Sequence, residues 1–484
     1  MKLYSSNENY KLYHGNMLDM LEIIEPNSID SIITDPPYGL TSITKRFGKE
    51  DSVECQYGKD GSFQRLSRGF MGKEWDGSGI EYNIETWQKC YEVLKPGGYL
   101  LAFGGSRTFH RIACAIEDAG FEIRDTIMWL YGSGFPKSMS LSKGLESREK
   151  LGNAGTRNKR KIEQACDTEE YKLKQTNNGI MGEIIETIRK EYVPNTELAK
   201  QWQGWGTALK PSFEPIIVAR KPFKGSLVDN VIEYGVGGIN IDECRVGNNG
   251  GTKKDCSTCN NNNLVYGNGL NGGKVEQINS GRFPANTILT YDETDFDEVC
   301  GGFPYTKSTG GSGISSKINT FKNVSIGAKN NTGSHLGGLG DEGSASRYFY
   351  CAKASKKDRD EGLEGFEEKK TGELQGGRKE GSAGSIMLNA DGTTRVNPYA
   401  GTGTPKKNTH PTVKPTSLMQ YLVRLVTPNG GIILDPFNGS GSTGKAVMYE
   451  NKERNKNYKY IGIELTEEYL PIAKARIEYI IKQR

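Results

Sequence analysis

Apolar and polar positions along the first part of the chain alternate in a pattern of short strands and helices. Short apolar or alternating runs predict five strands, at residues 10–14, 29–35, 99–103, 121–131 and 214–220. Apolar positions at helical spacing predict helices between the first four strands, at residues 17–24, 84–94 and 107–119. Strands that alternate with helices are typical of an α/β protein, so we expect a doubly wound, mostly parallel sheet.

The same alternation returns at the end of the chain. It predicts helices at residues 415–425, from 445 onward and at 467–481, and strands at residues 432–434 and 460–464. The stretch between the two α/β parts, residues 225–405, is dominated by glycine, asparagine, serine and lysine, and we expect a loop-rich, irregular domain there. Residues 137–203 are charged and read as a partly helical insertion, with helix expected at 146–150 and 183–190.

Composition narrows the class of protein. The 484 residues exceed one ordinary core, so we expect two or three domains. Nine scattered cysteines, an odd number, do not form a disulfide framework. No apolar run has membrane-spanning length and the first residues lack a signal-peptide core, so we expect a cytoplasmic protein without a membrane partner. The formal net charge of +4 is too small to indicate nucleic-acid binding by itself.

The stretch Asp35-Pro36-Pro37-Tyr38 follows the second predicted strand. Its two prolines end the strand ladder and stiffen the turn, which fixes one carboxylate and one aromatic ring at the carboxyl edge of the sheet. Open α/β sheets bind their ligands at that edge. An acceptor carboxylate, the Pro36 carbonyl and a stacking face suit a planar base that carries an exocyclic amine. The structural alternative is a surface turn with a packed tyrosine.

A glycine-rich turn, residues 435–444, follows a strand and precedes a helix in the C-terminal part. Its three glycines allow positive φ and a close approach of a ligand to the backbone. Glu464 lies 20 residues after Gly444 and is placed to accept hydrogen bonds from ribose hydroxyls. The carboxylate of Asp435 would repel a pyrophosphate. A cationic sulfonium cofactor with a ribose therefore fits better than a dinucleotide.

Taken together, the Asp-Pro-Pro-Tyr stretch and the glycine turn resemble the β group of S-adenosylmethionine-dependent DNA amino-methyltransferases. In that family the Asp-Pro-Pro-Tyr motif comes first, a target-recognition domain follows, and a Phe-x-Gly-x-Gly motif comes last. The resemblance implies a methyltransferase sheet in this permuted motif order with an inserted, loop-rich recognition domain. The corresponding parts are the catalytic half at residues 1–224 (with the insertion at about 137–203), the target-recognition domain at 225–405 and the cofactor-binding half at 406–484.

The resemblance also implies the chemistry. A methyl group would pass from S-adenosylmethionine to adenine N6 in duplex DNA, on a base flipped out of the helix. The implied catalytic residues are Asp35, Pro36, Pro37 and Tyr38. The implied cofactor-binding residues are Asn16, Lys414, Asp435, Pro436, Phe437, Asn438, Gly439, Ser440, Gly441 and Glu464. No metal is expected; a homodimer and a cognate restriction enzyme are compatible partners.

Several roles stay open at this stage. Cytosine N4 is the alternative target base, although an aspartate at the first motif position favours adenine within the family. Asn16 stands where the family often has aspartate, so it could contact an adenine ring without a charge. Lys414 could meet the cofactor carboxylate or a DNA phosphate, or be a plain surface lysine. RNA or protein substrates, or a catalytically inactive DNA-binding protein, are remoter alternatives.

Other signals are weaker. Residues 40–79 lack a lasting period and suit a mobile lid, because they follow the base-binding edge. Cys256 and Cys259 have zinc-ligand spacing, but no second pair accompanies them. The basic cluster at residues 157–161 is either a solvated helix end or a phosphate contact.

Overall fold

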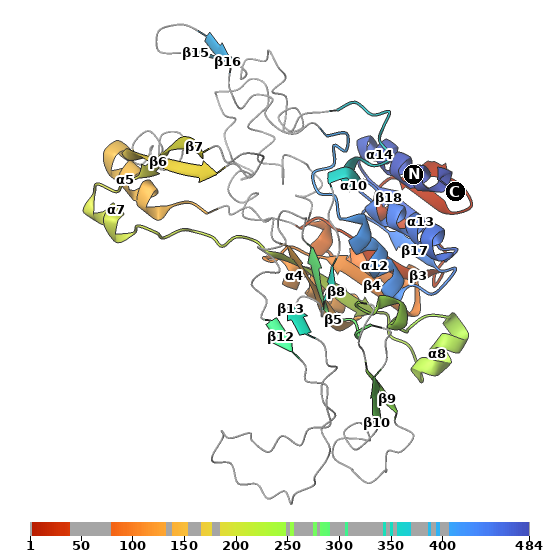
Figure 1. The fold of residues 1–484 in the computed structure, drawn as a ribbon. Helices are drawn as coiled ribbons and strands as arrows, with labels where there is room; N and C mark the ends of the chain where they lie inside the picture. The colour runs from red at the N-terminus through yellow and green to blue at the C-terminus, as the bar shows by residue number, and fades with distance from the viewer. Residues whose placement is uncertain are drawn as a thin grey trace, which may run out of the picture. The chain divides into compact units, whose positions relative to one another are not determined.

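A ten-stranded mixed sheet is the largest element of the computed structural model (Figure 1). The structure describes residues 2–38, 79–131, 138–152, 166–176, 184–247, 252–255, 274–277, 281–290, 305–307, 342–344, 349–351, 356–368, 386–388, 394–396 and 406–483. The chain divides into two compact units, one made of Met1–Gly132 with Phe213–Arg484 and the other of Ser133–Ser212. Residues 40–78 of the expected lid, the basic cluster, Cys256 and Cys259 lie outside the described residues.

The sheet interleaves strands from both ends of the chain, in the order β1-β2-β18-β17-β3-β4-β8-β5-β11-β14. In that order the strands are Lys2–Ser6, Tyr10–His14, Lys459–Glu464, Ile432–Asp435, Ile29–Thr34, Leu94–Phe103, Phe213–Arg220, Glu122–Tyr131, Thr287–Thr290 and Tyr350–Cys351. Neighbours from β2 to β4 are parallel, whereas β8 is antiparallel to both β4 and β5. The predicted mostly parallel α/β sheet is therefore confirmed, with the C-terminal β17 and β18 completing the N-terminal strands (Figure 1).

Helices cover both faces of this sheet. One face carries α1 (Met17–Leu21), α3 (Ile84–Val93) and α4 (Phe109–Asp118), and the other carries α12 (Thr416–Val426), α13 (Ser442–Arg454) and α14 (Leu470–Lys482). Alternate residues of β4 serve the two cores: Leu100 and Ala102 pack with the first set, Leu101 and Phe103 with the second. Burial on both faces explains why the central strands are continuous apolar runs.

Residues 225–405 contribute more regular structure to the larger unit than their composition predicts. β11 and β14 extend the central sheet, and α8 (Leu227–Tyr234) packs against β4. The described residues of this range also contain α10 (Lys356–Asp360), the 3-10 turn Asp242–Cys244 and three antiparallel two-stranded sheets. These sheets pair Thr252–Asp255 with Lys274–Gln277, Tyr305–Lys307 with Glu342–Ser344, and Ile386–Leu388 with Thr394–Val396. The domain boundaries at 225 and 405 stay a prediction.

The smaller unit contains the residues of the predicted insertion. It has α5 (Leu141–Leu151), the antiparallel strands β6 (Thr168–Thr176) and β7 (Ile184–Tyr192), and α7 (Glu197–Gln201). The helix expected at residues 183–190 is wrong, because that stretch forms β7. β-Branched residues fill four of its first five positions, and this composition favours a strand over a helix. In the described parts of the chain, every helix is too short or too polar to cross a membrane.

Candidate active site

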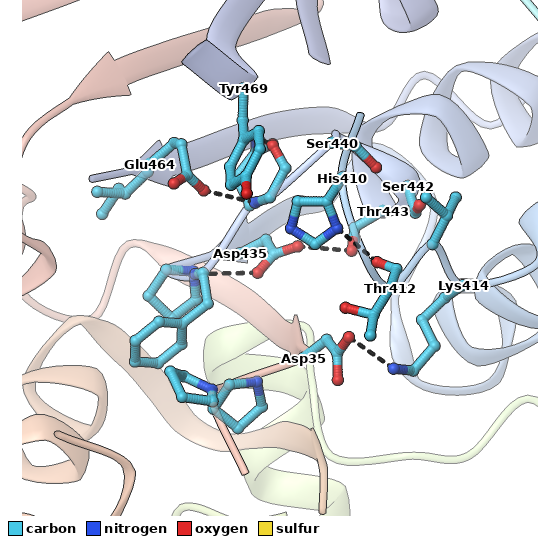
Figure 2. Close-up of a pocket in the computed structure, with 18 of the residues that line it drawn as sticks. Asp35, His410, Thr412, Lys414, Asp435, Ser440, Ser442, Thr443, Glu464 and Tyr469 are labelled. Carbon is cyan, nitrogen blue, oxygen red and sulfur yellow. Dashed lines mark hydrogen bonds and ion pairs between the residues drawn. The ribbon is translucent and has the colours of Figure 1, made fainter. Parts of the chain in front are cut away.

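A cavity of about 690 Å³ opens at the carboxyl ends of the parallel strands. Parallel strands present these ends at one edge of a sheet, so the turns after β2, β3, β17 and β18 meet there although they are far apart in sequence. Of the residues that the sequence assigns to the site, all except Gly441 line this cavity (Figure 2). The fold therefore brings the Asp-Pro-Pro-Tyr turn and the glycine turn into one site.

Asp35 lies at the end of β3 beside a buried lysine. Its Oδ2 accepts a hydrogen bond of 2.6 Å from the Nζ of Lys414, which is drawn as a dashed line in Figure 2. Its Oδ1 is buried and has no hydrogen-bond partner among the described residues. A buried acceptor without a partner is costly, so this oxygen is available for a donor on a bound molecule.

Lys414 is the cation of this corner. Its side chain is only 7% exposed, so the interpretation as a plain surface lysine is wrong. Its Nζ also lies 3.4 Å from the carboxylate of Glu214 and 3.1 Å from the hydroxyl of Tyr38. Burial lowers the pKa of Lys414, but the carboxylates of Asp35 and Glu214 outweigh burial and raise it above the usual value. The sequence grouped Lys414 with the glycine turn, whereas the structure pairs it with the Asp-Pro-Pro-Tyr turn.

Tyr38 is fixed at both its backbone and its hydroxyl. Its carbonyl accepts from Thr108 Oγ1 at 2.8 Å and from the hydroxyl of Tyr82 at 2.9 Å. Its own hydroxyl donates to Glu214 Oε2 at 2.9 Å. Burial, together with the negative charges of Asp35 and Glu214, raises the pKa of Tyr38 well above its usual value. The hydroxyl therefore stays protonated at neutral pH.

Asp435 holds the glycine turn to the sheet. It is 2% exposed. Its Oδ1 accepts from Thr34 Oγ1 at 2.7 Å and from the Phe437 amide at 3.1 Å, and its Oδ2 accepts from Thr443 Oγ1 at 2.6 Å. Burial raises the pKa of Asp435 to about 6. These contacts make Asp435 a residue that shapes the turn.

The glycines of the turn allow close packing that a side chain would prevent. Gly439 has φ +52°, and a Cβ there would lie 2.9 Å from His410 Nε2. Gly441 has φ +74°, and a Cβ there would lie 2.9 Å from the Cβ of Ala473 in α14. Gly441 therefore packs the turn against a helix, which explains why it is absent from the cavity wall.

Glu464 and Asn16 line the cavity next to the carboxyl ends of β18 and β2. Glu464, at the end of β18, accepts from the amides of Gly439 and Thr466, each at 2.7 Å. Burial raises the pKa of Glu464 to about 7. Because each carboxylate oxygen has a second lone pair, both oxygens retain capacity for a ligand hydroxyl. Asn16 accepts from the amide of Leu18 at 3.1 Å and so caps α1 while lining the cavity.

Sequence reasoning missed several residues of the cavity wall. They are Trp129, Glu214, Arg359, His410 and Tyr469. His410 Nδ1 lies 2.6 Å from the Thr412 carbonyl, and burial lowers the pKa of His410 to about 4, so its ring is neutral. Its ring packs edge-on against Tyr469, with the centroids 4.6 Å apart. The signal for Glu214 was a lone charge at the start of an apolar strand.

No group of three or more histidine, cysteine or acidic side chains gathers as a metal site within the described ranges. The expectation that catalysis needs no metal stays a prediction.

Comparison with known proteins identifies the family. The family model described as DNA methylase (N6_N4_Mtase) matches residues 29–475. The type II methyltransferase M.HindIII of Haemophilus influenzae is 25% identical over 248 residues, which are 47% of this chain and 64% of that protein. M.HpaI of Haemophilus parainfluenzae is 31% identical over 133 residues, 27% of this chain and 35% of that protein. The chain thus spans less than two thirds of either relative.

Solved structures are more distant. The PvuII DNA methyltransferase (cytosine-N4-specific) aligns with 99% of this chain and 94% of its own, at a TM-score of 0.36 and 13% identity. This similarity is too low to support any conclusion, so the fold is described from the strand order of the chain itself. The family match, in contrast, runs from the strand before Asp35 to the last helix. The chain therefore belongs to the N6/N4 DNA methylase family.

Proposed function

We propose that this protein transfers a methyl group from S-adenosylmethionine to adenine N6 in duplex DNA, with cytosine N4 as the alternative. The observation that carries the proposal is one cavity that contains both the glycine turn with Glu464 and a buried Asp35 oxygen that has no hydrogen-bond partner in the described part of the chain. A volume of about 690 Å³ is within the usual range for sites that enclose a cofactor. Membership of the N6/N4 family supports the same reaction.

The residues of the C-terminal half suit the cofactor. The Gly439 backbone, in the left-handed region, lets a ligand approach closely, and Glu464 would accept from the ribose hydroxyls. Phe437 and Asn16 line the same wall and would contact the adenine ring. When bound, S-adenosylmethionine supplies an electrophilic methyl group on its sulfonium. The described lining has four carboxyl groups against two cations, Lys414 and Arg359, a balance that suits a cationic ligand.

The residues of the N-terminal half suit the amine. An exocyclic amine is a poor nucleophile because its lone pair is conjugated into the base. Asp35 Oδ1 and the Pro36 carbonyl would accept its hydrogens, which favours a pyramidal nitrogen whose lone pair faces the methyl carbon. The N–C bond would form as the methyl–sulfur bond of the sulfonium breaks, which leaves a neutral thioether. The methylated nitrogen would be cationic, so its N–H would be acidic and would pass its proton to Asp35. The ring of Tyr38, held by Glu214 and Thr108, would stack on the flipped base.

Adenine is the first choice because of the aspartate at the first motif position. The homodimer, the cognate restriction enzyme and the cytoplasmic location stay predictions. The deciding experiment incubates the purified chain with unmethylated DNA and S-adenosylmethionine, digests the DNA, and identifies the nucleosides by mass spectrometry. We expect N6-methyladenine. N4-methylcytosine would keep the mechanism and change the base, and unmodified DNA despite cofactor binding would overturn the DNA substrate.

Cofactor affinity should rise with pH through the neutral range. Ribose hydroxyls donate to the ionised form of Glu464, whereas burial raises the pKa of this group to about 7 in the free protein. Below pH 7 the cofactor must therefore displace the proton of Glu464 when it binds. At higher pH Glu464 is already ionised, and binding releases no proton from it. We expect S-adenosylmethionine to bind about tenfold more weakly at pH 6 than at pH 8. Isothermal titration calorimetry in two buffers of different ionisation enthalpy measures both the affinity and the released proton.

The variant Glu464→Gln tests the assignment of this pH dependence. It should bind S-adenosylmethionine about tenfold more weakly at pH 8 and lose the pH dependence. Glu468→Gln is the matched control, because that carboxylate is exposed and four residues away. Unchanged affinity and slope in Glu464→Gln would show that the ribose lies elsewhere.

A further inference from the structure

The segment of residues 356–368 packs firmly against the cofactor-binding half, although the sequence assigns it to the recognition domain. Asp358 in α10 accepts from the Thr416 amide at 2.8 Å, at the start of α12. It also pairs with the fully buried Lys445 at 2.6 Å. Leu363 is fully buried and packs with Tyr469. The segment is thus anchored on α12, α13 and α14, and it carries one side chain, Arg359, to the wall of the cavity.

Arg359 has carbonyl partners but no ion-pair partner among the described residues. Its Nη2 donates to the carbonyls of His410 at 2.5 Å and Asn408 at 3.3 Å. Among those residues its buried Nε has no hydrogen-bond partner, and the carboxylate of Asp360 acts on it only through its charge. Burial lowers the pKa of Arg359, yet a guanidinium keeps its proton at neutral pH. A partly buried cation with an unused N–H is well suited to an anion.

The other charges of the cavity leave Arg359 as the available cation. The described lining residues include four carboxylates, Asp35, Glu214, Asp435 and Glu464, and two cations, Lys414 and Arg359. Lys414 is already bound by Asp35 and Glu214, at 2.6 and 3.4 Å. The neutral ring of His410 cannot replace a charge. An anionic group that enters this cavity would meet four carboxyl groups and one cation, Arg359, that forms no ion pair among the described residues.

We propose that Arg359 binds the carboxylate of the amino-acid part of S-adenosylmethionine, which rests on the proposed function. Arg359 holds the main chain of His410, whose ring lies against Gly439, so the guanidinium is beside the glycine turn. Figure 2 labels His410 and Ser440 among the residues that line this cavity. The assignment also leaves Lys414 to Asp35, instead of sharing it with the cofactor.

The test compares two ligands in the full-length protein by isothermal titration calorimetry. The ligands are S-adenosylmethionine and its decarboxylated analogue, which keeps the adenosine, the sulfonium and the amine. Wild type should bind S-adenosylmethionine about 30-fold more tightly than the analogue. Arg359→Gln should lose most of this preference. Its affinity for S-adenosylmethionine should fall about 30-fold, while its affinity for the analogue should change by less than about twofold. Arg359→Lys should keep part of the preference, because lysine keeps the positive charge but lacks the paired N–H donors of the guanidinium.

Lys357→Gln is the matched control, because it removes a cation from the exposed side of the same helix and should change neither affinity. Equal weakening of both ligands in Arg359→Gln, or equal affinities in wild type, would overturn the inference. Failure of wild type to bind either ligand would instead overturn the proposed function. Thermal unfolding of each variant identifies a folding defect, and Arg359→Lys then replaces Arg359→Gln in the comparison.

Discussion

Replacing Asp35 by asparagine is expected to lower the rate of methyl transfer by about 10³-fold, with cofactor affinity within about threefold of wild type. The structure explains why the isosteric amide should not substitute. Lys414 donates to Asp35 Oδ2 at 2.6 Å, so the amide carbonyl would turn toward the ammonium. The amide N–H₂ would then occupy the position of Oδ1 and face the amine hydrogens of the base. A donor would meet a donor where the reaction needs an acceptor.

The measurement is a single-turnover rate with labelled S-adenosylmethionine and duplex DNA, alongside calorimetric binding of the cofactor. Asp35→Ala should be as slow as Asp35→Asn, because both lack the acceptor. Asp19→Asn is the matched control: Asp19 is exposed on α1, which begins at the cavity edge, and its loss should leave the rate unchanged. A rate above about one tenth of wild type in Asp35→Asn would remove Asp35 from the chemistry.

Both halves of the site could be predicted from sequence because each is local. Asp35 and Asp435 each follow a short apolar strand directly, and a turn at the end of a parallel strand has a known place at the sheet edge. The strand order adds that β17 pairs with β3, which brings the two turns together. No local sequence pattern predicts that β17 pairs with β3. The expectation that the two turns share one site came only from the resemblance to a family with permuted motifs.

Glu214 and Arg359 could not be predicted, because their places depend on long-range packing. Glu214 lies near the start of β8, and only the antiparallel pairing of β8 with β4 puts that start at the edge where β3 ends. Arg359 reaches the cavity because Asp358 and Leu363 anchor its segment on distant helices. The composition of the surrounding stretch, rich in glycine and asparagine, suggested loops. The strands β11 and β14 lie in the same stretch and contain only four and two residues, which is too short for a clear alternating pattern.

Lys414 should act as a positioning residue that holds Asp35 in place through their hydrogen bond of 2.6 Å. Burial lowers the pKa of Lys414, but Asp35 and Glu214 raise it overall, so Lys414 is a fixed cation between two carboxylates. In Lys414→Gln the two carboxylates lose their shared counter-charge, and Asp35 loses the donor that orients it. We expect the rate of methyl transfer to fall about 100-fold, with S-adenosylmethionine affinity within about threefold of wild type.

Two further variants separate this role from simple packing. Lys414→Arg keeps the charge and should restore most of the rate. The double variant Lys414→Gln/Glu214→Gln removes the second carboxylate, so it should recover part of the lost rate although the cation is still absent. A Lys414→Arg enzyme as slow as Lys414→Gln would reduce the lysine to a packing role. A large loss of S-adenosylmethionine affinity, with the decarboxylated analogue unaffected, would give the cofactor carboxylate to Lys414 and take it from Arg359.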